Sequence, residues 1–154
     1  MIKINVILNN IIWKKYLKDP HSFIDKKIEL LNKKNKAYAK NTLICSLLLS
    51  GTAEIKKLNK KFRKKNKHTD ILSFPSGQKT KNLKKIYLGD IIISYNYMNK
   101  PKDLTNFEFK KKTIKIFIHG YLHLLGYNHI NLKDYRIMYR EEKKVFESIE
   151  KLLN

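Results

Sequence analysis

The chain has 154 residues and a formal net charge of +21 at pH 7, from 34 lysines and arginines against 13 aspartates and glutamates. This length suits a single hydrophobic core, so we expect one domain spanning residues 1–154. A lone cysteine, Cys45, excludes an intramolecular disulfide, and the lack of a signal peptide or of an apolar run of about 18 residues leaves the cytoplasm as the expected location.

The first third of the chain predicts two strands and two helices. Apolar residues alternate with other residues over 2–8, which is the period-two pattern of a strand. A short helix is expected over 10–18. Ser22 followed by Asp25 has the pattern of a capping box and predicts the start of a second helix. The nearly continuous apolar run 42–49 predicts a buried strand.

The middle of the chain predicts one helix and two further strands. Thr52 is expected to be the N-cap of a helix that ends at Arg63. A short strand is predicted over 70–74, before a Pro-Ser-Gly turn, and another over 86–95. The basic segment 78–85 between them is expected to be a solvated loop, since no aromatic residues interleave with its lysines.

The last third predicts two long helices. The first spans about 107–125, and the second spans 132–153 with its inward side formed by Met138, Val145, Ile149 and Leu152. Together the elements predict an α+β fold, in which a mixed sheet of about four strands is packed with helices that cover its apolar faces.

Three of the five histidines lie near the end of the first long helix. His119 and His123 are four residues apart, so they face the same side of a helix one turn apart. Gly126 is suited to the left-handed residue that ends the helix, and a turn after it can return His129 to the pair. Three neutral nitrogen ligands with a fourth position left open is the pattern of a catalytic zinc site.

The alternative is that these histidines belong to the core. The apolar residues of this helix, however, fall within one stripe of about 100°, and His119 and His123 lie about 160° from its middle. Metal binding therefore explains the pair better than packing does. A zinc peptidase of the H-E-x-x-H type carries a glutamate after the first histidine, but here that residue is Gly120.

Three blocks of sequence, taken together, resemble one known family. The segment 119–129, HGYLHLLGYNH, is similar to the H-G-x-L-H-L-x-G-Y-D-H signature of the YbeY family of bacterial endoribonucleases that act in rRNA maturation. LNKKFR at 58–63 followed by TDILSFP at 69–75 forms a second block, and GDIIIS at 89–94 forms a third. Two positions depart from the family pattern: Asn128 replaces an aspartate, which implies weaker metal binding, and His68 replaces a proline.

Arg63 has two interpretations. A cation at the end of a helix offsets the helix dipole, but lysine would do this equally well, and lysine outnumbers arginine about tenfold. A planar guanidinium can instead clamp a phosphate through paired hydrogen bonds. The family resemblance favours the second interpretation, because the family has an important arginine at this place. Asp90 either supports a turn or touches the metal, and we expect the turn.

The resemblance implies a zinc-dependent endoribonuclease that acts in rRNA maturation and ribosome quality control, on a fold with a metal-binding helix like that of other zinc hydrolases. It implies one zinc ion held by His119, His123 and His129, with Arg63 as the catalytic residue. The expected partners are RNA, especially rRNA and ribosomal particles, with no membrane and no DNA. The attacking group is either water or the RNA 2′-hydroxyl. The alternatives are a zinc metalloprotease or amidohydrolase, and a ribosome-associated factor whose metal is mainly structural.

Overall fold

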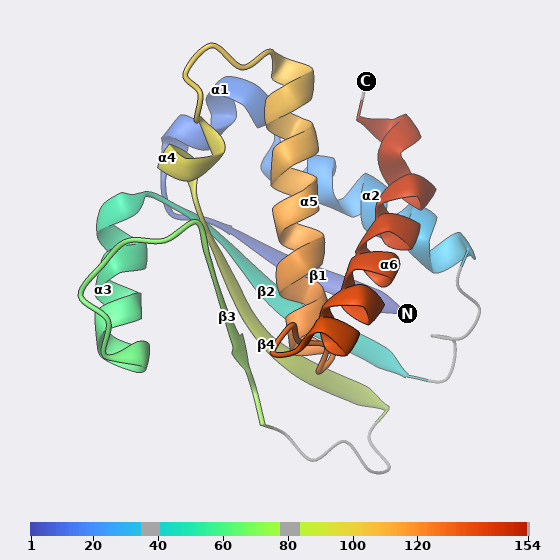
Figure 1. Ribbon diagram of the computed structural model, residues 1–154. Coiled ribbons are helices and arrows are strands. Elements are labelled where there is room, and N and C mark those ends of the chain that lie inside the picture. Colours follow the sequence, from blue (N-terminus) through green and yellow to red (C-terminus); the bar gives the residue numbers. More distant parts are fainter. Residues whose placement is uncertain (35–40, 78–83, 154) are drawn as a thin grey trace.

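A four-stranded sheet forms the centre of the computed structural model, which describes residues 1–34, 41–77 and 84–153 (Figure 1). The strands follow the order β1-β2-β4-β3 across the sheet. The first three of these are parallel, and β3 runs antiparallel to β4 at one edge. The expected α+β fold with a mixed sheet is therefore confirmed. The strand bounds are β1 Ile2–Leu8, β2 Thr42–Ser50, β3 Ile71–Pro75 and β4 Lys85–Ser94.

Helices connect these strands and account for most of the remaining described residues. In Figure 1, α5 and α6 lie in front of the sheet and α3 lies beside one end of it. A 3-10 turn, η1, precedes α1, and a second one, η3, follows α6. The bounds are η1 Ile11–Trp13, α1 Lys14–Leu17, α2 Pro20–Lys34, α3 Thr52–Arg63, α4 Tyr95–Met98, α5 Asn106–Leu124, α6 Leu132–Ile149 and η3 Glu150–Leu152. Within the described segments, no helix is both long enough and apolar enough to cross a bilayer.

The sheet buries one hydrophobic cluster on each face, because alternate residues of a strand point to opposite sides. The larger cluster joins β1, β2 and β4 to α2, α5 and α6, with the fully buried Trp13 in contact with Phe109 and Tyr95. The smaller cluster lies under α3 and is centred on Ile55, Leu72 and Ile92. Helix α5, which the sequence predicted to bind the metal, thus packs on the face of the sheet that carries the larger cluster, against β3 and β4.

Two predicted helix starts are wrong. Helix α2 begins at Pro20, and the side chain of Asp19 accepts the backbone N–H of Ser22 at 3.1 Å, so Asp19 takes the capping role that the Ser22 pattern suggested. Helix α3 already includes Thr52, and its N-cap is Gly51. In both cases the N-cap lies earlier in the chain than predicted, by three residues for α2 and by one residue for α3.

The C-terminal prediction is also partly wrong. Met138 and Ile149 are buried as expected, but Leu152 is 38% exposed. The α-helix gives way to η3 after Ile149, and the change of period turns Leu153 toward the core instead. Of the predicted loop 78–85, residues 78–83 lie outside the described residues.

A bulge lies in β4 where it passes β2. Gly89 has φ +135°, a conformation that L side chains rarely adopt, and the register of β2 against β4 shifts there. Asp90 follows within the strand and accepts a hydrogen bond from the Tyr87 hydroxyl at 2.6 Å. The prediction that Asp90 supports a turn is therefore wrong, since this residue belongs to a strand.

Candidate metal centre

Helix α5 ends in a turn that places the third histidine. The N–H of Tyr127 bonds the carbonyl of Leu122 at 3.0 Å, and the N–H of Gly126 bonds that of His123 at 3.0 Å. These two bonds form a Schellman motif around Gly126, whose φ is +92°. The predicted glycine helix stop is confirmed. The chain then turns back, so that His129 lies beside the helix it has just left.

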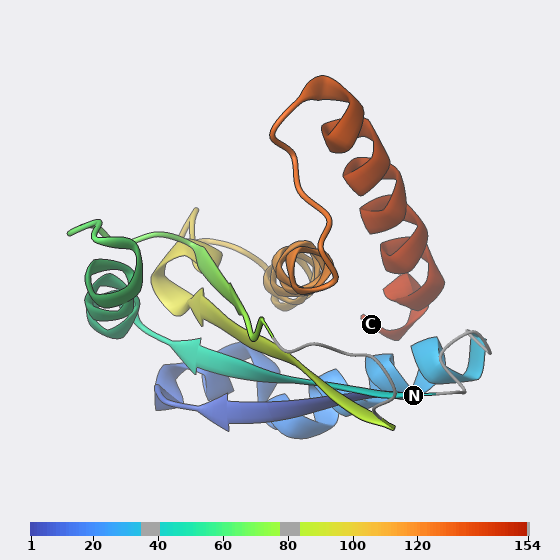
Figure 2. The ribbon, with the colours of Figure 1, turned by 90° about the horizontal axis from the view of Figure 1, so that it is seen from below.

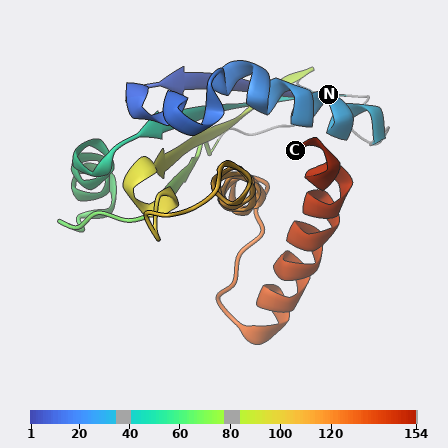
Figure 3. The same cartoon turned by 90° about the horizontal axis from the view of Figure 1, so that it is seen from above.

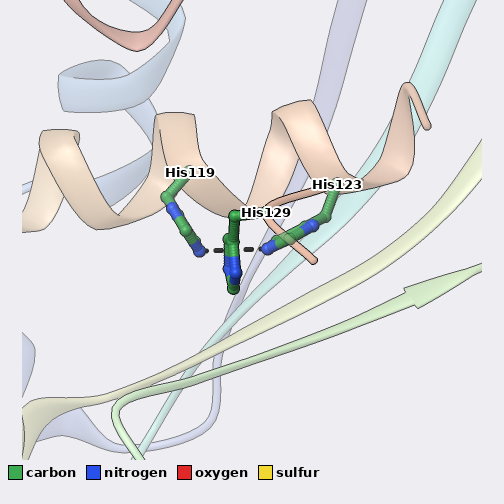
Figure 4. A group of neighbouring side chains, drawn as sticks. All are labelled: His119, His123 and His129. Atoms are coloured by element: carbon green, nitrogen blue, oxygen red, sulfur yellow. Dashed lines mark hydrogen bonds between the residues drawn. The ribbon is translucent and has the colours of Figure 1, made fainter. Parts of the chain in front are cut away.

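The three histidine rings converge on one point (Figure 4). One ligand atom from each of His119, His123 and His129 lies within 4.8 Å of the other two. The Nε2 atoms of His119 and His123 are 3.0 Å apart, and the ring of His129 lies 5.4 Å and 5.1 Å from theirs, between centroids. The grouping expected from the sequence is present, and it could hold a metal ion.

The hydrogen bonds of the two outer ring nitrogens, Nδ1 of His119 and Nδ1 of His123, show why a cation fits between these rings. Nδ1 of His119 lies 2.6 Å from Oε1 of Glu142, and Nδ1 of His123 lies 3.0 Å from the carbonyl oxygen of Tyr127. A carboxylate and a carbonyl only accept, so both Nδ1 atoms are donors, and in the neutral rings both Nε2 atoms carry lone pairs. Two lone pairs that face each other at this distance need a proton or a metal ion between them.

The spacing also matches a tetrahedral ion. Two nitrogens that are each about 2.0–2.1 Å from tetrahedral zinc lie about 3.4 Å from one another, close to the 3.0 Å that separates the Nε2 atoms of His119 and His123. Burial lowers the pKa of His123 below its usual value, and His119 beside it lowers it further. His123 is therefore neutral at pH 7, which is the form that binds metals.

Glu142 is the residue that sequence reasoning missed. It lies on α6, and its carboxylate reaches His119 on α5 from 23 positions further along the chain. A carboxylate in this place orients the imidazole and raises its basicity, as outer partners of metal ligands commonly do. The sequence around Glu142, Arg-Glu-Glu-Lys-Lys, gave no indication of this contact, because only the packing of α6 on α5 brings Glu142 to His119.

A glycine lets α5 approach the sheet closely enough to form the site. A Cβ added to Gly120 would lie 2.6 Å from Cδ1 of Ile71, 2.9 Å from Oγ of Ser73 and 3.1 Å from Cγ2 of Ile91. Ser73 donates a hydrogen bond to the carbonyl of Gly120 at 3.3 Å. The residue that replaces the peptidase glutamate therefore serves as the contact point between α5 and β3.

Arg63 lies in the same cleft as the three histidines. A hollow of about 500 Å³ is lined by Arg63, the three histidines, Ser73 and Asn128, among others. Nη2 of Arg63 donates to the carbonyl of Ser73 at 3.2 Å, and its guanidinium lies 5.7 Å from the centre of the Phe74 ring. The fold thus brings the end of α3 to the histidine cluster, although Arg63 and His119 are 56 positions apart and the spacing alone could not show this. Asn128 is exposed at the edge of the cleft.

The chain is similar to known proteins along nearly its whole length. It is 48% identical over 149 residues to the endoribonuclease YbeY of Pelagibacter ubique, covering 97% of each chain. It is 35% identical over 150 residues to the endoribonuclease YbeY of Ehrlichia canis, covering 97% of this chain and 93% of that protein. A relative with the same name from Persephonella marina is 34% identical over 139 residues, covering 90% and 84%.

A solved structure supports the fold. The solution structure of a Thermotoga maritima protein matches with a TM-score of 0.60, at 24% sequence identity, covering 96% of this chain and 89% of that one. The family model described as endoribonuclease YbeY matches residues 9–150. With this match and the identities above, the chain belongs to the YbeY endoribonuclease family.

Proposed function

We propose that this protein is a zinc-dependent endoribonuclease that hydrolyses RNA phosphodiester bonds at the three-histidine centre. The observation that carries the proposal is the convergence of His119, His123 and His129 in a cleft that also contains Arg63. Residues 1–154 would act as one catalytic domain. In the described part of the chain, the metal-binding group consists of three histidines without a carboxylate, which favours an open coordination position over a closed structural site.

Three imidazoles in this arrangement suit zinc, which when bound would supply Lewis-acid polarisation of the phosphodiester and activation of water. The chain itself supplies the orientation of the ligands. Glu142 holds the ring of His119 and the Tyr127 carbonyl holds that of His123. Both histidines are thereby fixed with Nε2 toward the cleft before an ion or a substrate arrives.

Arg63 has the role of offsetting charge on the phosphate. Its Nη2 is engaged by the carbonyl of Ser73, which steadies the guanidinium while other N–H groups remain available for two phosphate oxygens. Charge that builds on the phosphate during attack is stabilised by this fixed cation. The attacking group is water or the 2′-hydroxyl of the substrate, and the same placement of Arg63 serves both.

The substrate that we infer is ribosomal RNA, within ribosomal particles in the cytoplasm, with roles in rRNA maturation and ribosome quality control. The net charge of +21 would speed encounter with such polyanions. The relatives named above are endoribonucleases. Both points agree with an RNA substrate rather than a peptide.

A peptidase would need a carboxylate base beside the ion. Glu142 is the acidic residue found in contact with a histidine of the cluster, and it lies on the outer nitrogen of His119, away from the cleft side. Asp70 accepts from the N–H of Ile71 and the hydroxyl of Thr69, and Asp90 is engaged by Tyr87. These placements favour phosphodiester over peptide chemistry.

The test combines metal analysis with RNA cleavage for three proteins. Purified wild type should contain about one zinc per chain and cut rRNA. The variant His123→Ala should lose both properties, whereas Arg63→Lys should keep the metal and lose activity, because the charge remains while the planar fork does not. Cleavage that survives in His123→Ala after loss of metal would contradict the proposal, and full activity in Arg63→Lys would remove Arg63 from the mechanism.

A further inference from the structure

A second hollow lies near the other end of α5 from the metal centre. Its volume is about 540 Å³, and its walls come from α1, the start of α2, the start of α5 and η3. The view from below shows the end of α5 where the chain turns toward α6 (Figure 2), and the view from above shows the opposite end, beside α1 and α2 (Figure 3). Lys110 in the hollow and His119 at the metal centre are nine positions apart on α5, about 13 to 14 Å along its axis and on opposite sides of it. The two sites are therefore separate.

Lysines dominate the charge of this hollow, which we call the lysine hollow. Five lysines and one carboxylate line it and give it a net charge of +4: Lys18, Lys26, Lys27, Lys110, Lys151 and Asp19. Asp19 accepts the backbone N–H of Ser22 at 3.1 Å, and within the described ranges no ion pair joins it to a lysine. A concave surface lined by one sign of charge concentrates ions of the opposite sign. The lysine hollow therefore favours an anion.

The other acidic groups of the surrounding elements are turned away or already paired. Asp25 and Glu29 lie two positions before and after Lys27 on α2, which places each of them about 200° around the helix from it. Glu29 and Glu150 pair with lysines outside the hollow, at 2.7 Å and 2.9 Å. Glu108 caps the start of α5. The positive charge of the hollow is therefore not neutralised by these carboxylates.

Lys27 distinguishes the lysine hollow from a patch of surface lysines. It is only 4% exposed, and its Nζ lies 3.7 Å from the centre of the Phe23 ring. The face of that ring can take one of the three N–H groups of the ammonium, and no side chain or carbonyl of the described residues accepts a hydrogen bond from the others. Burial, with Lys110 and Lys26 nearby, lowers the pKa of Lys27 to about 8. A buried cation without an acceptor is unfavourable, and an anion in the hollow would supply the acceptor.

We propose that the lysine hollow binds a chain of two or three linked phosphates, either inorganic or carried by a nucleotide. One terminal phosphate has a charge of about −1.5 to −2 at pH 7, so two or three of them match the charge of +4 that lines the hollow. A lysine ammonium binds phosphate oxygens as a point charge. Such charges are offered at three depths, by the buried Lys27, the half-buried Lys110 and the exposed Lys26.

The shape of the hollow favours a terminal phosphate chain over the backbone of RNA. A backbone phosphate has a sugar on each side, so it suits exposed cations on an open surface, whereas Lys27 is reached by a group that enters the hollow end first. The volume of about 540 Å³ lies within the usual range of small-ligand sites. Leu17 and Leu152 also line it, and Leu152, which the sequence predicted to point inward, is 38% exposed there. These apolar side chains suit the nucleoside of a nucleotide.

Isothermal titration of chelator-treated protein with sodium tripolyphosphate, and separately with ATP, tests the proposal without a contribution from bound metal. Lys27→Met should weaken binding of both by at least about tenfold, because it removes the buried charge. The matched control is Lys56→Met, which removes an exposed charge from α3 and should stay within about twofold of wild type. Tighter binding of ATP than of tripolyphosphate would identify a nucleotide as the ligand, and equal affinities would identify the phosphate chain alone.

Proton uptake is a second readout, which a general loss of charge does not change. An anion beside Lys27 raises its pKa above 8, so binding at pH 8 should take up about half a proton, and Lys27→Met should lose this uptake. Titrations in buffers of different ionisation enthalpy measure it. Equal affinities of Lys27→Met and Lys56→Met, or no binding to wild type at about 1 mM ligand, would overturn the proposal. A loss of binding in Arg63→Gln would also overturn it, because the phosphates would then lie in the metal cleft.

Discussion

Oε1 of Glu142 lies 2.6 Å from Nδ1 of His119, and this one contact connects α6 to the metal centre on α5. It links the last long helix of the chain to the face of the cleft where the three histidines meet. The contact makes His119 a donor on its outer side and turns its Nε2 toward that of His123, 3.0 Å away, where an ion could bind. Glu142 is therefore a positioning residue for the proposed metal.

Replacing Glu142 by alanine should weaken zinc binding by about 10- to 100-fold, the usual effect of losing a carboxylate behind a histidine ligand. The measurement is competition with a chromogenic chelator at pH 7. The control is Glu147→Ala on the same helix, whose carboxylate pairs only loosely with Lys143 at 3.8 Å and is largely exposed. Equal zinc affinity in the two variants would show that Glu142 does not act on the metal.

Replacing Gly120 by alanine should destabilise the fold by about 1–3 kcal/mol, because the new methyl group meets Ile71, Ser73 and Ile91 at 2.6–3.1 Å. The direction of the change in stability is informative, because a glycine-to-alanine change inside a free helix is stabilising by about 1 kcal/mol. Urea unfolding measures the change. Lys115→Ala, exposed on the same helix, should stay within about 0.5 kcal/mol of wild type, and a stabilised Gly120→Ala protein would mean that α5 and β3 are less closely packed.

Replacing Gly126 by alanine should reduce both stability and metal affinity. A φ of +92° is unfavourable for alanine by about 1–2 kcal/mol, and relief of this strain would move the Tyr127 carbonyl away from His123. Gly77→Ala is the matched control, because Gly77 also has a positive φ, of +67°, but lies outside the metal cleft. The control should lose stability while it keeps its zinc affinity.

The buried side chain of Lys27 should make the free energy of unfolding depend on pH. Burial lowers its pKa to about 8, with its Nζ 3.7 Å from the centre of the Phe23 ring. Because the unfolded chain has the higher pKa, near 10.5, the folded state binds fewer protons between these values, and stability rises with pH there. Lys27→Met should therefore be more stable than wild type at pH 7, by a margin that shrinks by pH 10.

The measurement for this variant is urea unfolding at both pH values, with Lys26→Met as the control. Lys26 is exposed on the same helix, and replacing it should give the same small difference from wild type at pH 7 and at pH 10. A margin for Lys27→Met that does not change with pH would show that Lys27 stays charged in the folded protein over this range.

The parts of the molecule that were predictable are those specified by local pattern. Alternation in 2–8 and the apolar run 42–49 identified two strands, because side-chain period is a property of a few neighbouring residues. The i and i+4 spacing of His119 and His123, with Gly126 after it, identified the histidine cluster for the same reason. Each of these features depends only on the residues of one helix or strand and on the turn that follows it.

What escaped prediction depends on contacts between distant segments. Glu142 resembles any other acidic residue of a solvated helix until α6 packs on α5. The choice of Asp19 over Ser22, and of Gly51 over Thr52, as helix starts was decided by a competition among similar local caps. That Arg63 reaches the cleft follows from the placement of α3 beside the sheet, which no spacing along the chain reveals.

The carboxylate of Glu142, which orients His119, lies on α6, a helix that is translated after α5. During synthesis α5 emerges before α6, so we expect the growing polypeptide to hold a metal ion weakly until α6 has packed on α5.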